Sequence, residues 1–290
     1  MNFVVVGTGA WGTAFAKVLR DGEHDVFAAS RETLDDAPYD EADVVVIAVP
    51  SQAFREVLGH VRGSAPVLSL VKGLDPESGE RLSTLVQGRP VAVLSGPNMA
   101  EEVLAGLPGA TVIASEDEAL ALHLQEAINS LAFRVYVNSD LIGVEICAAA
   151  KNVIGLSAGG VDGLGLGDNA KAALITRGLV EMARLGEALG AEPETFSGLA
   201  GLGDLVCTCW HPSGRNRRAG ELIARGATPD DARAQIGQVV EGLTTAPVLR
   251  DLSRRIGVEL PITEGVCAVL SGQSLTDLAA GLMGRAPTEE

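Results

Sequence analysis

An apolar run that leads into a glycine-rich turn at the N-terminus constrains the fold of this chain most strongly. Residues 3–6, FVVV, pass directly into GTGAWG at 7–12, and a helical pattern follows. In a GxGxxG turn Gly7 permits the tight turn, Gly9 lets a pyrophosphate approach the backbone, and Gly12 allows close helix-to-strand packing. The position of the turn predicts a dinucleotide site; a purely structural glycine turn is the alternative.

Further apolar segments predict a Rossmann-like, doubly wound α/β sheet. The segments interpreted as strands after the first are 25–30, 44–49, 66–71, 91–97, 110–115 and 133–140. The run at 44–49, VVVIAV, is apolar throughout, which is typical of a parallel strand buried on both faces. Lys72 directly follows the strand at 66–71. Ligands bind at the carboxyl ends of strands in such sheets, so Lys72 is a functional candidate rather than an arbitrary surface lysine.

The end of the second predicted strand indicates which dinucleotide is bound. NAD-preferring sites usually carry an acid there, whereas this chain has Ser30, Arg31 and Glu32 in succession. A serine and an arginine suit a 2′-phosphate better than a 2′-hydroxyl, so NADP(H) is expected in preference to NAD(H). Glu32 weakens this preference, and a solvated arginine at a strand end is the alternative interpretation.

The alternation of strands and helices ends near residue 140. Only helical periodicity follows, which predicts an NAD(P)-binding domain over 1–139 and an all-α substrate domain over 140–290. The pattern at 169–190 predicts a long helix with Gly190 as its stop.

Two charged residues lie one turn apart within that long helix. Arg177 and Glu181 have the i, i+4 spacing at which opposite charges meet on a helix surface. We expect them to pair in a structural role.

The segment at 140–161 is a predicted helix that carries a lysine in apolar surroundings. Asp140 suits the N-cap and the Gly159-Gly160 pair suits the stop. A helix that is apolar on nearly every face is normally buried, and burial of an ammonium is costly unless it is paired or its pKa falls. Lys151 is therefore a catalytic candidate; a lysine that snorkels to the surface is the alternative.

Two polar segments of the helical half offer partners for that lysine and for a ligand. Asp204 lies in a glycine-rich apolar stretch and needs a partner, for which Lys151 is the natural choice; a helix cap is the alternative. Arg215 and Asn216, within SGRNRR at 213–218, supply a planar fork and an amide that suit a phosphate ester. A solvated basic turn is the alternative there.

Composition excludes several classes of partner and site. The 290 residues carry a formal charge of −16, which argues against nucleic acid or an anionic membrane surface as partner. The four cysteines show no CxxC spacing and only four histidines accompany them, so no metal site is expected and the thiols are predicted to be reduced. No targeting pattern precedes the first strand, and no apolar run approaches the ~20 residues of a membrane span, so a cytoplasmic protein is expected.

Taken together, the segments resemble the NAD(P)-dependent glycerol-3-phosphate dehydrogenases in their bacterial form. The motifs that carry the resemblance are GTGAWGTA, IAVPSQAF, KGL, SGPNMAEEV, GVEICAAAKNVIGLSAG, GDNAKAALITRGLVEM, GLAGLGDLVCTC, SGRNRR, VVEGLTTA and GVELPITEGV. The resemblance implies reversible hydride transfer from NAD(P)H to dihydroxyacetone phosphate, a small phosphorylated three-carbon substrate. The product is sn-glycerol 3-phosphate for glycerophospholipid synthesis. Family and composition together also imply a homodimer.

Position within these motifs gives each residue an expected role. Lys151 falls on the catalytic acid/base, and Lys72, Asp204, Asn152 and Thr208 are expected beside it in catalysis. The expected substrate contacts are Lys72, Gly96, Asn98, Lys151, Asp204, Gly214, Arg215 and Asn216. The expected cofactor contacts are Gly7, Gly9, Ala10, Trp11, Gly12, Arg31, Lys72, Ala100, Arg215, Val239 and Glu241.

Three departures from the family pattern qualify these roles. The chain is short over 31–43, where relatives usually carry a helix, a strand and a proline-rich loop, so the adenine side of the pocket is expected to be more open. Asn98 stands where many relatives have serine or threonine. Gly214 stands where bacterial members often have serine, and each change is expected to affect a hydrogen bond to substrate.

Two other functions are compatible with parts of the pattern. A hydroxyacid or ketopantoate reductase shares the broad architecture, but its carboxylate substrate does not require both GRNR and GLGDLVCTC. A non-catalytic dinucleotide sensor would keep the fold without turnover. The intact Lys151 and Asp204 argue against the sensor.

Overall fold

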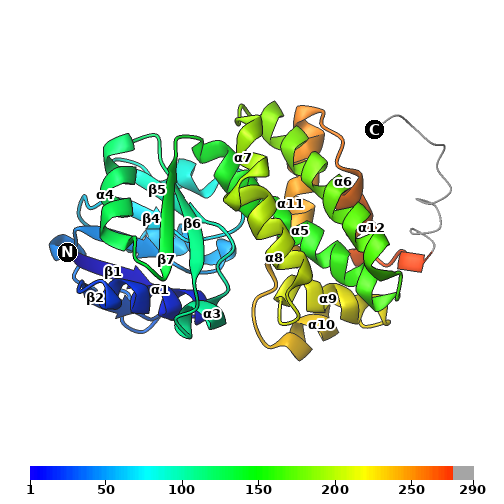
Figure 1. The fold of residues 1–290 in the computed structure, drawn as a ribbon, viewed down its shortest axis with the longest axis horizontal. Helices are drawn as coiled ribbons and strands as arrows, with labels where there is room; N and C mark the ends of the chain where they lie inside the picture. Colours follow the sequence, from blue (N-terminus) through cyan, green and yellow to red (C-terminus); the bar gives the residue numbers. More distant parts are fainter. Residues whose placement is uncertain (277–290) are drawn as a thin grey trace.

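The protein consists of a sheet-containing part and a helical part that lie side by side (Figure 1). The structure is a computed structural model and describes residues 1–276; the rest of the predicted 140–290 domain lies outside the described residues. The strands are β1 (Asn2–Val6), β2 (Asp25–Ala29), β3 (Val44–Ile47), β4 (Val67–Ser69), β5 (Val91–Ser95), β6 (Gly109–Ala114) and β7 (Phe133–Asn138).

These strands form one seven-stranded sheet with the order β2-β1-β3-β4-β5-β6-β7. The first five strands are parallel, β6 is antiparallel to β5, and β7 is parallel to β6. The Rossmann-like α/β fold is therefore confirmed, with a reversal at β6 that the apolar runs alone did not predict. The carboxyl ends of β1 to β5 lie at one edge of the sheet, where an open α/β fold places its ligands.

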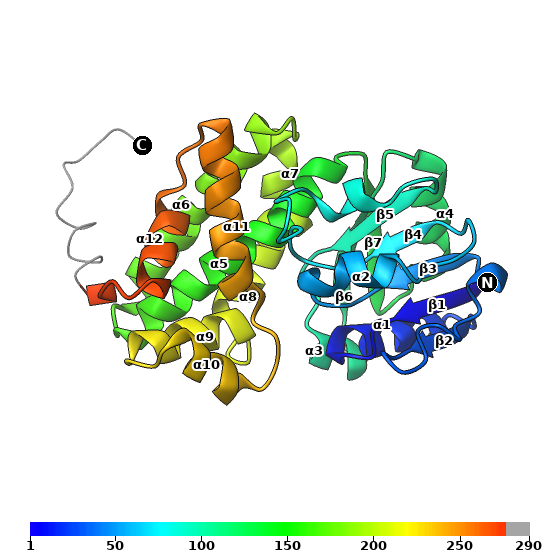
Figure 2. The ribbon, with the colours of Figure 1, turned by 180° about the vertical axis from the view of Figure 1, so that it is seen from behind.

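The strands are apolar because helices cover both faces of the sheet. Phe3 and Val5 of β1 point to the face covered by α1 (Ala10–Asp21), α3 (Ala100–Leu104) and α4 (Glu118–Ile128). Val4 and Val6 point to the opposite face, where α2 (Phe54–Leu58) packs, as Figure 2 shows. Alternate side chains on a strand point to opposite faces, so both sets must be apolar.

The short segment between β2 and β3 leaves β2 at the edge of the sheet. It contains one helical turn, Tyr39–Glu41, and the buried Tyr39 hydroxyl donates to the Leu34 carbonyl oxygen at 2.9 Å. Phe27 of β2 is 38% exposed. This side of the sheet therefore ends at β2, in keeping with the open adenine side expected from the sequence.

The second part is built from helices packed around a central one, α5. The helices are α5 (Leu141–Gly163), α6 (Gly167–Ala188), α7 (Pro193–Ser197), α8 (Asp204–Trp210), α9 (Arg215–Ala224), α10 (Pro229–Ile236), α11 (Glu241–Ile256) and α12 (Pro261–Leu270), with a π-helical turn at Leu199–Gly203. The predicted N-cap is present, because Asp140 accepts a hydrogen bond from the Gly143 amide at 2.8 Å. Gly190, with φ of 91°, follows α6 as the predicted stop.

The helix α5 is longer than predicted because its glycines pack rather than terminate. Gly159 and Gly160 were expected to end it, but it continues to Gly163. A Cβ on Gly159 would lie 1.8 Å from the Arg217 carbonyl oxygen, and one on Gly220 of α9 would lie 1.8 Å from the Leu156 carbonyl oxygen. The glycines thus let the backbones of α5 and α9 touch.

By length and composition α5 resembles a membrane-spanning helix, which the sequence analysis did not anticipate. It has 23 residues, but 89% of its most apolar window is buried inside the protein. Apolar surface on all sides of a helix is equally required at the centre of a helical core. Burial among α6, α8, α9, α11 and α12 accounts for its composition.

The predicted pair of Arg177 and Glu181 is wrong. Within residues 1–276 no ion pair joins them; the Glu181 carboxylate instead accepts bonds from the amides of Ile262 and Thr263 at 2.7 and 3.0 Å. It also accepts from the Thr263 hydroxyl at 2.6 Å. The free amides at the start of α12 compete for a carboxylate more effectively than an exposed arginine does.

Candidate active site

A cleft of about 610 Å³ lies between the sheet and the helical part. It is lined by most of the residues predicted from the sequence: Gly9, Ala10, Trp11, Lys72, Asn98, Ala100, Lys151, Asn152, Asp204, Thr208, Gly214, Arg215, Asn216, Val239 and Glu241. Gly7, Gly12, Gly96 and Arg31 are not among the lining residues. The structure therefore brings segments from both halves of the chain to one cavity.

The glycine turn at the start of α1 has the geometry that its spacing predicts. Gly7 has φ of 111°, and a Cβ on Gly12 would lie 1.9 Å from the Gly7 carbonyl oxygen. Gly9 precedes α1, and no side chain caps the helix there. Apart from chain neighbours, no heavy atom of the described residues lies within 4 Å of the Cβ position of Gly9. This open helix N-terminus fits the pyrophosphate of a dinucleotide.

One buried carboxylate joins two lysines at the centre of the cleft. The Lys151 ammonium, on α5, donates to Asp204 Oδ1 and to the Thr208 hydroxyl, the latter at 3.0 Å. The Lys72 ammonium donates to Asp204 Oδ2 at 2.7 Å and to the Gly96 carbonyl oxygen at 2.9 Å. The predicted pair of Lys151 and Asp204 is therefore present, and snorkelling of Lys151, which is 5% exposed, is excluded.

The sharing of Asp204 by both lysines was not predicted. The signal for it in the sequence was the placement of Lys72 at the carboxyl edge of the sheet, where ligands bind. The Ser95 hydroxyl lies 3.5 Å from the same carboxylate oxygen as Lys72. The cluster therefore joins the segment after β4 to β5, α5 and α8.

Burial sets the protonation of this cluster. Burial lowers the pKa of Lys151 to about 8; Asp204 opposes this shift and the Lys72 charge adds to it. Burial alone would raise the pKa of Asp204, but the two ammonium groups hold it below its usual value. Near neutral pH the cleft thus contains an ammonium that can release a proton beside a carboxylate that stays ionised.

Two asparagine side chains connect the cluster to the neighbouring helices. Asn152 donates through its amide to the Lys72 carbonyl oxygen at 2.8 Å. Asn216 donates to Asn152 Oδ1 at 2.9 Å and accepts from the Gly242 amide at 2.8 Å. The Asn216 amide, expected to be free for a phosphate, is thus used in this connection between α5, α9 and α11.

Cations gather where α9 begins. Gly214 precedes α9 without a side-chain cap, so the helix presents unpaired amides at its N-terminus. Arg215 donates to the Val239 carbonyl oxygen at 3.1 Å, and both residues line the cleft, as does Arg218. An uncapped helix start surrounded by guanidinium groups favours a bound anion.

Three predicted ligand contacts also have places in the fold. Asn98 donates to the Ala110 carbonyl oxygen at 3.2 Å and accepts from the Thr111 hydroxyl at 3.1 Å, so its side chain is held against β6. Trp11 packs on Phe15 and Phe133, at ring-centroid distances of 5.9 and 6.5 Å. Ala100 is the first residue of α3.

A second bridge between the two parts involves Glu241, the predicted cofactor contact at the start of α11. Its carboxylate accepts from the Ser51 amide at 3.1 Å and from the Ser51 hydroxyl at 2.7 Å. The adjacent Gln52 amide donates to the Thr244 hydroxyl at 2.6 Å. Burial raises the pKa of Glu241. Sequence reasoning did not identify Ser51, because IAVPSQAF carried no signal for a partner in the other half of the chain.

The side chains after β2 lie outside the cleft lining. Arg31 is exposed and, among residues 1–276, has no hydrogen bond or ion pair. The Ser30 hydroxyl donates to the Glu32 carboxylate at 2.5 Å. This bond lowers the pKa of Glu32.

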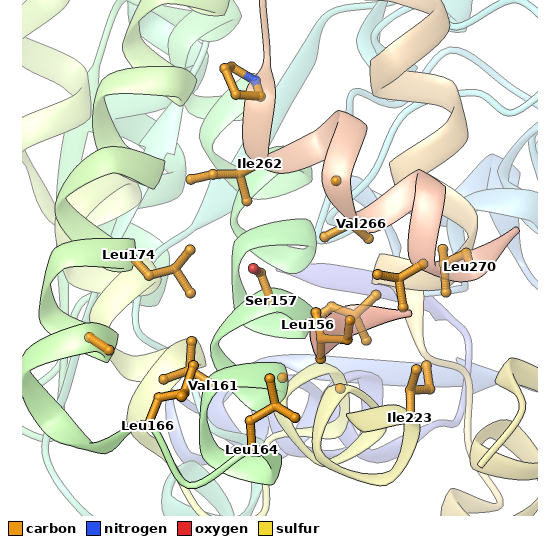
Figure 3. Close-up of a pocket in the computed structure, with 17 residues that line it drawn as sticks. Leu156, Ser157, Val161, Leu164, Leu166, Leu174, Ile223, Ile262, Val266 and Leu270 are labelled. Carbon is orange, nitrogen blue, oxygen red and sulfur yellow. The ribbon is translucent and has the colours of Figure 1, made fainter. Parts of the chain in front are cut away.

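A smaller pocket, of about 210 Å³, lies within the helical part (Figure 3). Side chains from α5, α6, α9 and α12 line it, among them Leu174 and Ile262. Ser157 is the only polar side chain among its described lining residues. It has no acid, base or cation, so the chemistry resides in the larger cleft.

Comparison with known proteins agrees with this geometry. The N-terminal model of the NAD-dependent glycerol-3-phosphate dehydrogenases matches residues 33–121 and the C-terminal model matches residues 140–279. The glycerol-3-phosphate dehydrogenase [NAD(P)+] of Salmonella paratyphi B is 41% identical over 329 aligned positions, covering 100% of this chain and 97% of that protein.

Solved structures separate this family from the rival reductases. A glycerol-3-phosphate dehydrogenase from Coxiella burnetii superposes with a TM-score of 0.92 at 35% identity, covering 98% of this chain and 99% of the other. A ketopantoate reductase from Ralstonia eutropha reaches a TM-score of 0.60 at 15% identity, covering 93% and 97%, and so shares the fold alone. The chain belongs to the NAD-dependent glycerol-3-phosphate dehydrogenase family.

Proposed function

We propose that the cleft catalyses reversible hydride transfer between NAD(P)H and dihydroxyacetone phosphate, with Lys151 as the proton donor. The observation that carries the proposal is the buried Lys151 ammonium bound to Asp204, between an open glycine turn and the cationic start of α9. This arrangement supplies a dinucleotide site, an acid and a phosphate site in one cavity. The product, sn-glycerol 3-phosphate, is the backbone precursor of glycerophospholipids.

The proton at Lys151 completes the reduction of the ketone. Hydride arriving at the substrate C2 leaves negative charge on the C2 oxygen, which a nearby ammonium stabilises and protonates. Asp204 orients the Lys151 ammonium and keeps its pKa from falling further, while the Thr208 hydroxyl accepts a second hydrogen bond from that ammonium. Lys72 places a second positive charge beside the same oxygen. In the oxidative direction Lys151 takes the proton back.

The residues at the start of α1 fit the cofactor. NAD(P)H supplies the hydride when bound. The amides after Gly9 would hold its pyrophosphate, and Ala10, Trp11 and Ala100 would contact it beside them. Val239, Arg215 and Glu241 would contact it from the helical part, while Gly7 and Gly12 act by shaping the turn.

The remaining lining residues are proposed to bind the substrate. Arg215 and the open amides of α9 would hold the phosphate, with Gly214 bordering them in the cleft and Asn216 fixing the helix relative to Asn152. The Gly96 carbonyl fixes Lys72, and Asn98 borders the same space.

We further propose that NADPH is preferred to NADH. The support is the exposed guanidinium of Arg31 just after β2, next to Ser30, at the edge of the sheet where an adenosine ribose binds in this fold. A paired measurement of kcat/KM for NADPH and NADH tests this, together with the variant Arg31→Ala. A ratio that favours NADH, or that is unchanged in Arg31→Ala, contradicts the preference.

A homodimer and a cytoplasmic location complete the proposal. Leu166 and Val180, near the start of α6 and within it, are 50% and 44% exposed, which leaves apolar surface on the helical part for a second copy. All four cysteines are free, as predicted, in keeping with a reducing compartment. Light scattering of the purified protein would measure its mass; a monomer at micromolar concentration contradicts the dimer.

The central experiment is the decay of NADPH absorbance when purified protein meets dihydroxyacetone phosphate. Decay that requires the phosphorylated ketone supports the proposed reaction. Tight binding of NADPH and NADH without decay would instead favour the dinucleotide sensor. Decay with ketopantoate but not with dihydroxyacetone phosphate would favour the rival reductase.

A further inference from the structure

A second charged cluster lies behind the proposed phosphate site, outside the cleft lining. Asp162, in the last turn of α5, accepts from the Lys171 ammonium of α6 at 2.8 and 3.1 Å. The same carboxylate accepts from Arg217 Nε of α9 at 2.5 Å. Lys171 is only 4% exposed, so its ammonium group is buried beside this carboxylate.

Each cation of this cluster also holds another element. Lys171 lies 4.9 Å from the ring centroid of Trp210, the last residue of α8, in a cation–π contact. Arg217 donates to the Pro212 carbonyl oxygen, in the loop between α8 and α9, at 3.4 Å. Asp162 therefore ties the end of α8, the loop and the start of α9 to the end of α5.

The backbone contact of α5 and α9 makes this connection rigid. Gly159 and Gly220 let the two helices touch, and a Cβ on Gly163 would lie 2.6 Å from Ala224 Cβ. With no side-chain layer between the helices, α9 cannot slide along α5 or approach it further without a steric clash. Two side chains at the start of α9 restrain its rotation about this contact, since Asn216 bonds to Asn152 and Arg217 bonds to Asp162, both on α5.

We propose that Asp162 is a positioning residue for the substrate phosphate, acting through Arg217 on the start of α9. The same α5 helix carries Lys151, so the cluster sets the distance between the proton donor and the phosphate-binding amides and Arg215. A substrate gripped by its phosphate then presents its carbonyl to Lys151. This inference rests on the proposed phosphate site at the start of α9.

Charge and geometry predict opposite results for Asp162→Asn. Removal of a negative charge near the site would strengthen phosphate binding if charge alone mattered. Loss of the anchor would weaken it, because the amides and Arg215 lose their alignment. We expect the KM for dihydroxyacetone phosphate and the inhibition constant of inorganic phosphate to rise together by about tenfold, the scale of a small misplacement. NADPH affinity should change by less than about twofold, since the glycine turn of α1 is untouched.

Three further variants keep the test decisive. Arg217→Lys keeps the positive charge and leaves Asp162 paired with Lys171. This variant should therefore fold even if Asp162→Asn does not. We expect the KM for dihydroxyacetone phosphate and the inhibition constant of phosphate to rise in it as they do in Asp162→Asn. Glu181→Gln removes a buried carboxylate that holds α12 and is the matched control; both constants should match wild type. Arg215→Ala reports on the phosphate site itself.

The outcomes separate the two proposals. Weaker phosphate inhibition in Arg215→Ala, with unchanged or stronger inhibition in Arg217→Lys and Asp162→Asn, overturns the anchor alone. Unchanged inhibition in all three variants overturns the phosphate site together with the anchor. A joint rise in Glu181→Gln as large as in Arg217→Lys would show a general loss of packing and also overturns the anchor.

Discussion

The starts of α1 and α9 face the same cleft, and they differ in what surrounds them. Both helices follow a glycine without a side-chain cap, so both offer unpaired amides to an anion. No charged side chain stands within the glycine turn before α1, whereas Arg215 and Arg218 line the cleft beside α9. The difference supports the proposal that backbone amides bind the cofactor pyrophosphate, while side-chain charge binds the substrate phosphate.

The variant Lys151→Met has the largest expected effect, and it should impair proton donation to the substrate without affecting cofactor binding. Methionine has a similar volume but no proton to donate, so turnover should fall by at least ~10²-fold, the scale of general acid catalysis. NADPH affinity, measured by fluorescence titration, should stay near wild type because the start of α1 is intact. Near-normal turnover would remove Lys151 from the mechanism.

The variant Arg215→Ala should come next in size. Loss of a charge-assisted bond to phosphate corresponds to ~2 kcal/mol, or about 30-fold in kcat/KM for dihydroxyacetone phosphate. Unphosphorylated dihydroxyacetone should be affected little. Arg225→Ala, at the far end of the same helix, is the control. Equal losses on both substrates would assign Arg215 to the cofactor or the fold.

The variant Gly9→Ala should act only on the cofactor side. Its Cβ has open space, so the melting temperature should hold, while NADPH affinity falls by about tenfold because the methyl group stands where the pyrophosphate approaches. Gly12→Ala provides the contrast, because its Cβ would collide with the Gly7 carbonyl and lower stability. Unchanged affinity in Gly9→Ala would leave the turn a structural feature.

The pH dependence of reduction gives the smallest effect and sharpens the substrate side. With burial lowering the pKa of Lys151 to about 8, the ammonium form is full below neutral pH and is lost as pH rises. We expect kcat/KM for reduction to fall about fivefold from pH 8 to pH 9, one titrating proton donor. Asp204→Asn should move this limb to lower pH, since Asp204 favours the charged lysine. A limb that stays in place shows that another group titrates.

The sequence predicted the glycine turn, the buried lysine and its carboxylate because each has a local signature. The spacing of Gly7, Gly9 and Gly12 indicates a dinucleotide-binding turn, and the apolar neighbours of Lys151 indicate that it is buried. The end of α5 was misjudged because Gly159 has the composition of a helix stop, and only the approach of α9 explains its place inside the helix. The partner of Glu181 was also misjudged, because its true partners, the amides of Ile262 and Thr263, come from a distant helix.

Contacts between distant segments left no local signal at all. Ser51 and Glu241 are 190 residues apart, and nothing near either one indicates the other. The sequence could not show whether the Asn216 amide bonds to Asn152 or is free to bind a ligand. Such contacts depend on how separate elements pack against each other, and the hydrophobic periodicity of each element does not predict that packing.

The sharing of one carboxylate by two ammonium groups leaves an unbalanced positive charge at the centre of a protein whose formal charge is −16. A phosphorylated substrate is repelled by the outer surface and attracted only once it nears the cleft. Dissolved salt weakens the long-range repulsion more than the short-range attraction, because screening grows with distance. The association rate of the substrate should therefore increase with moderate ionic strength, the reverse of what electrostatic steering by a cationic surface produces.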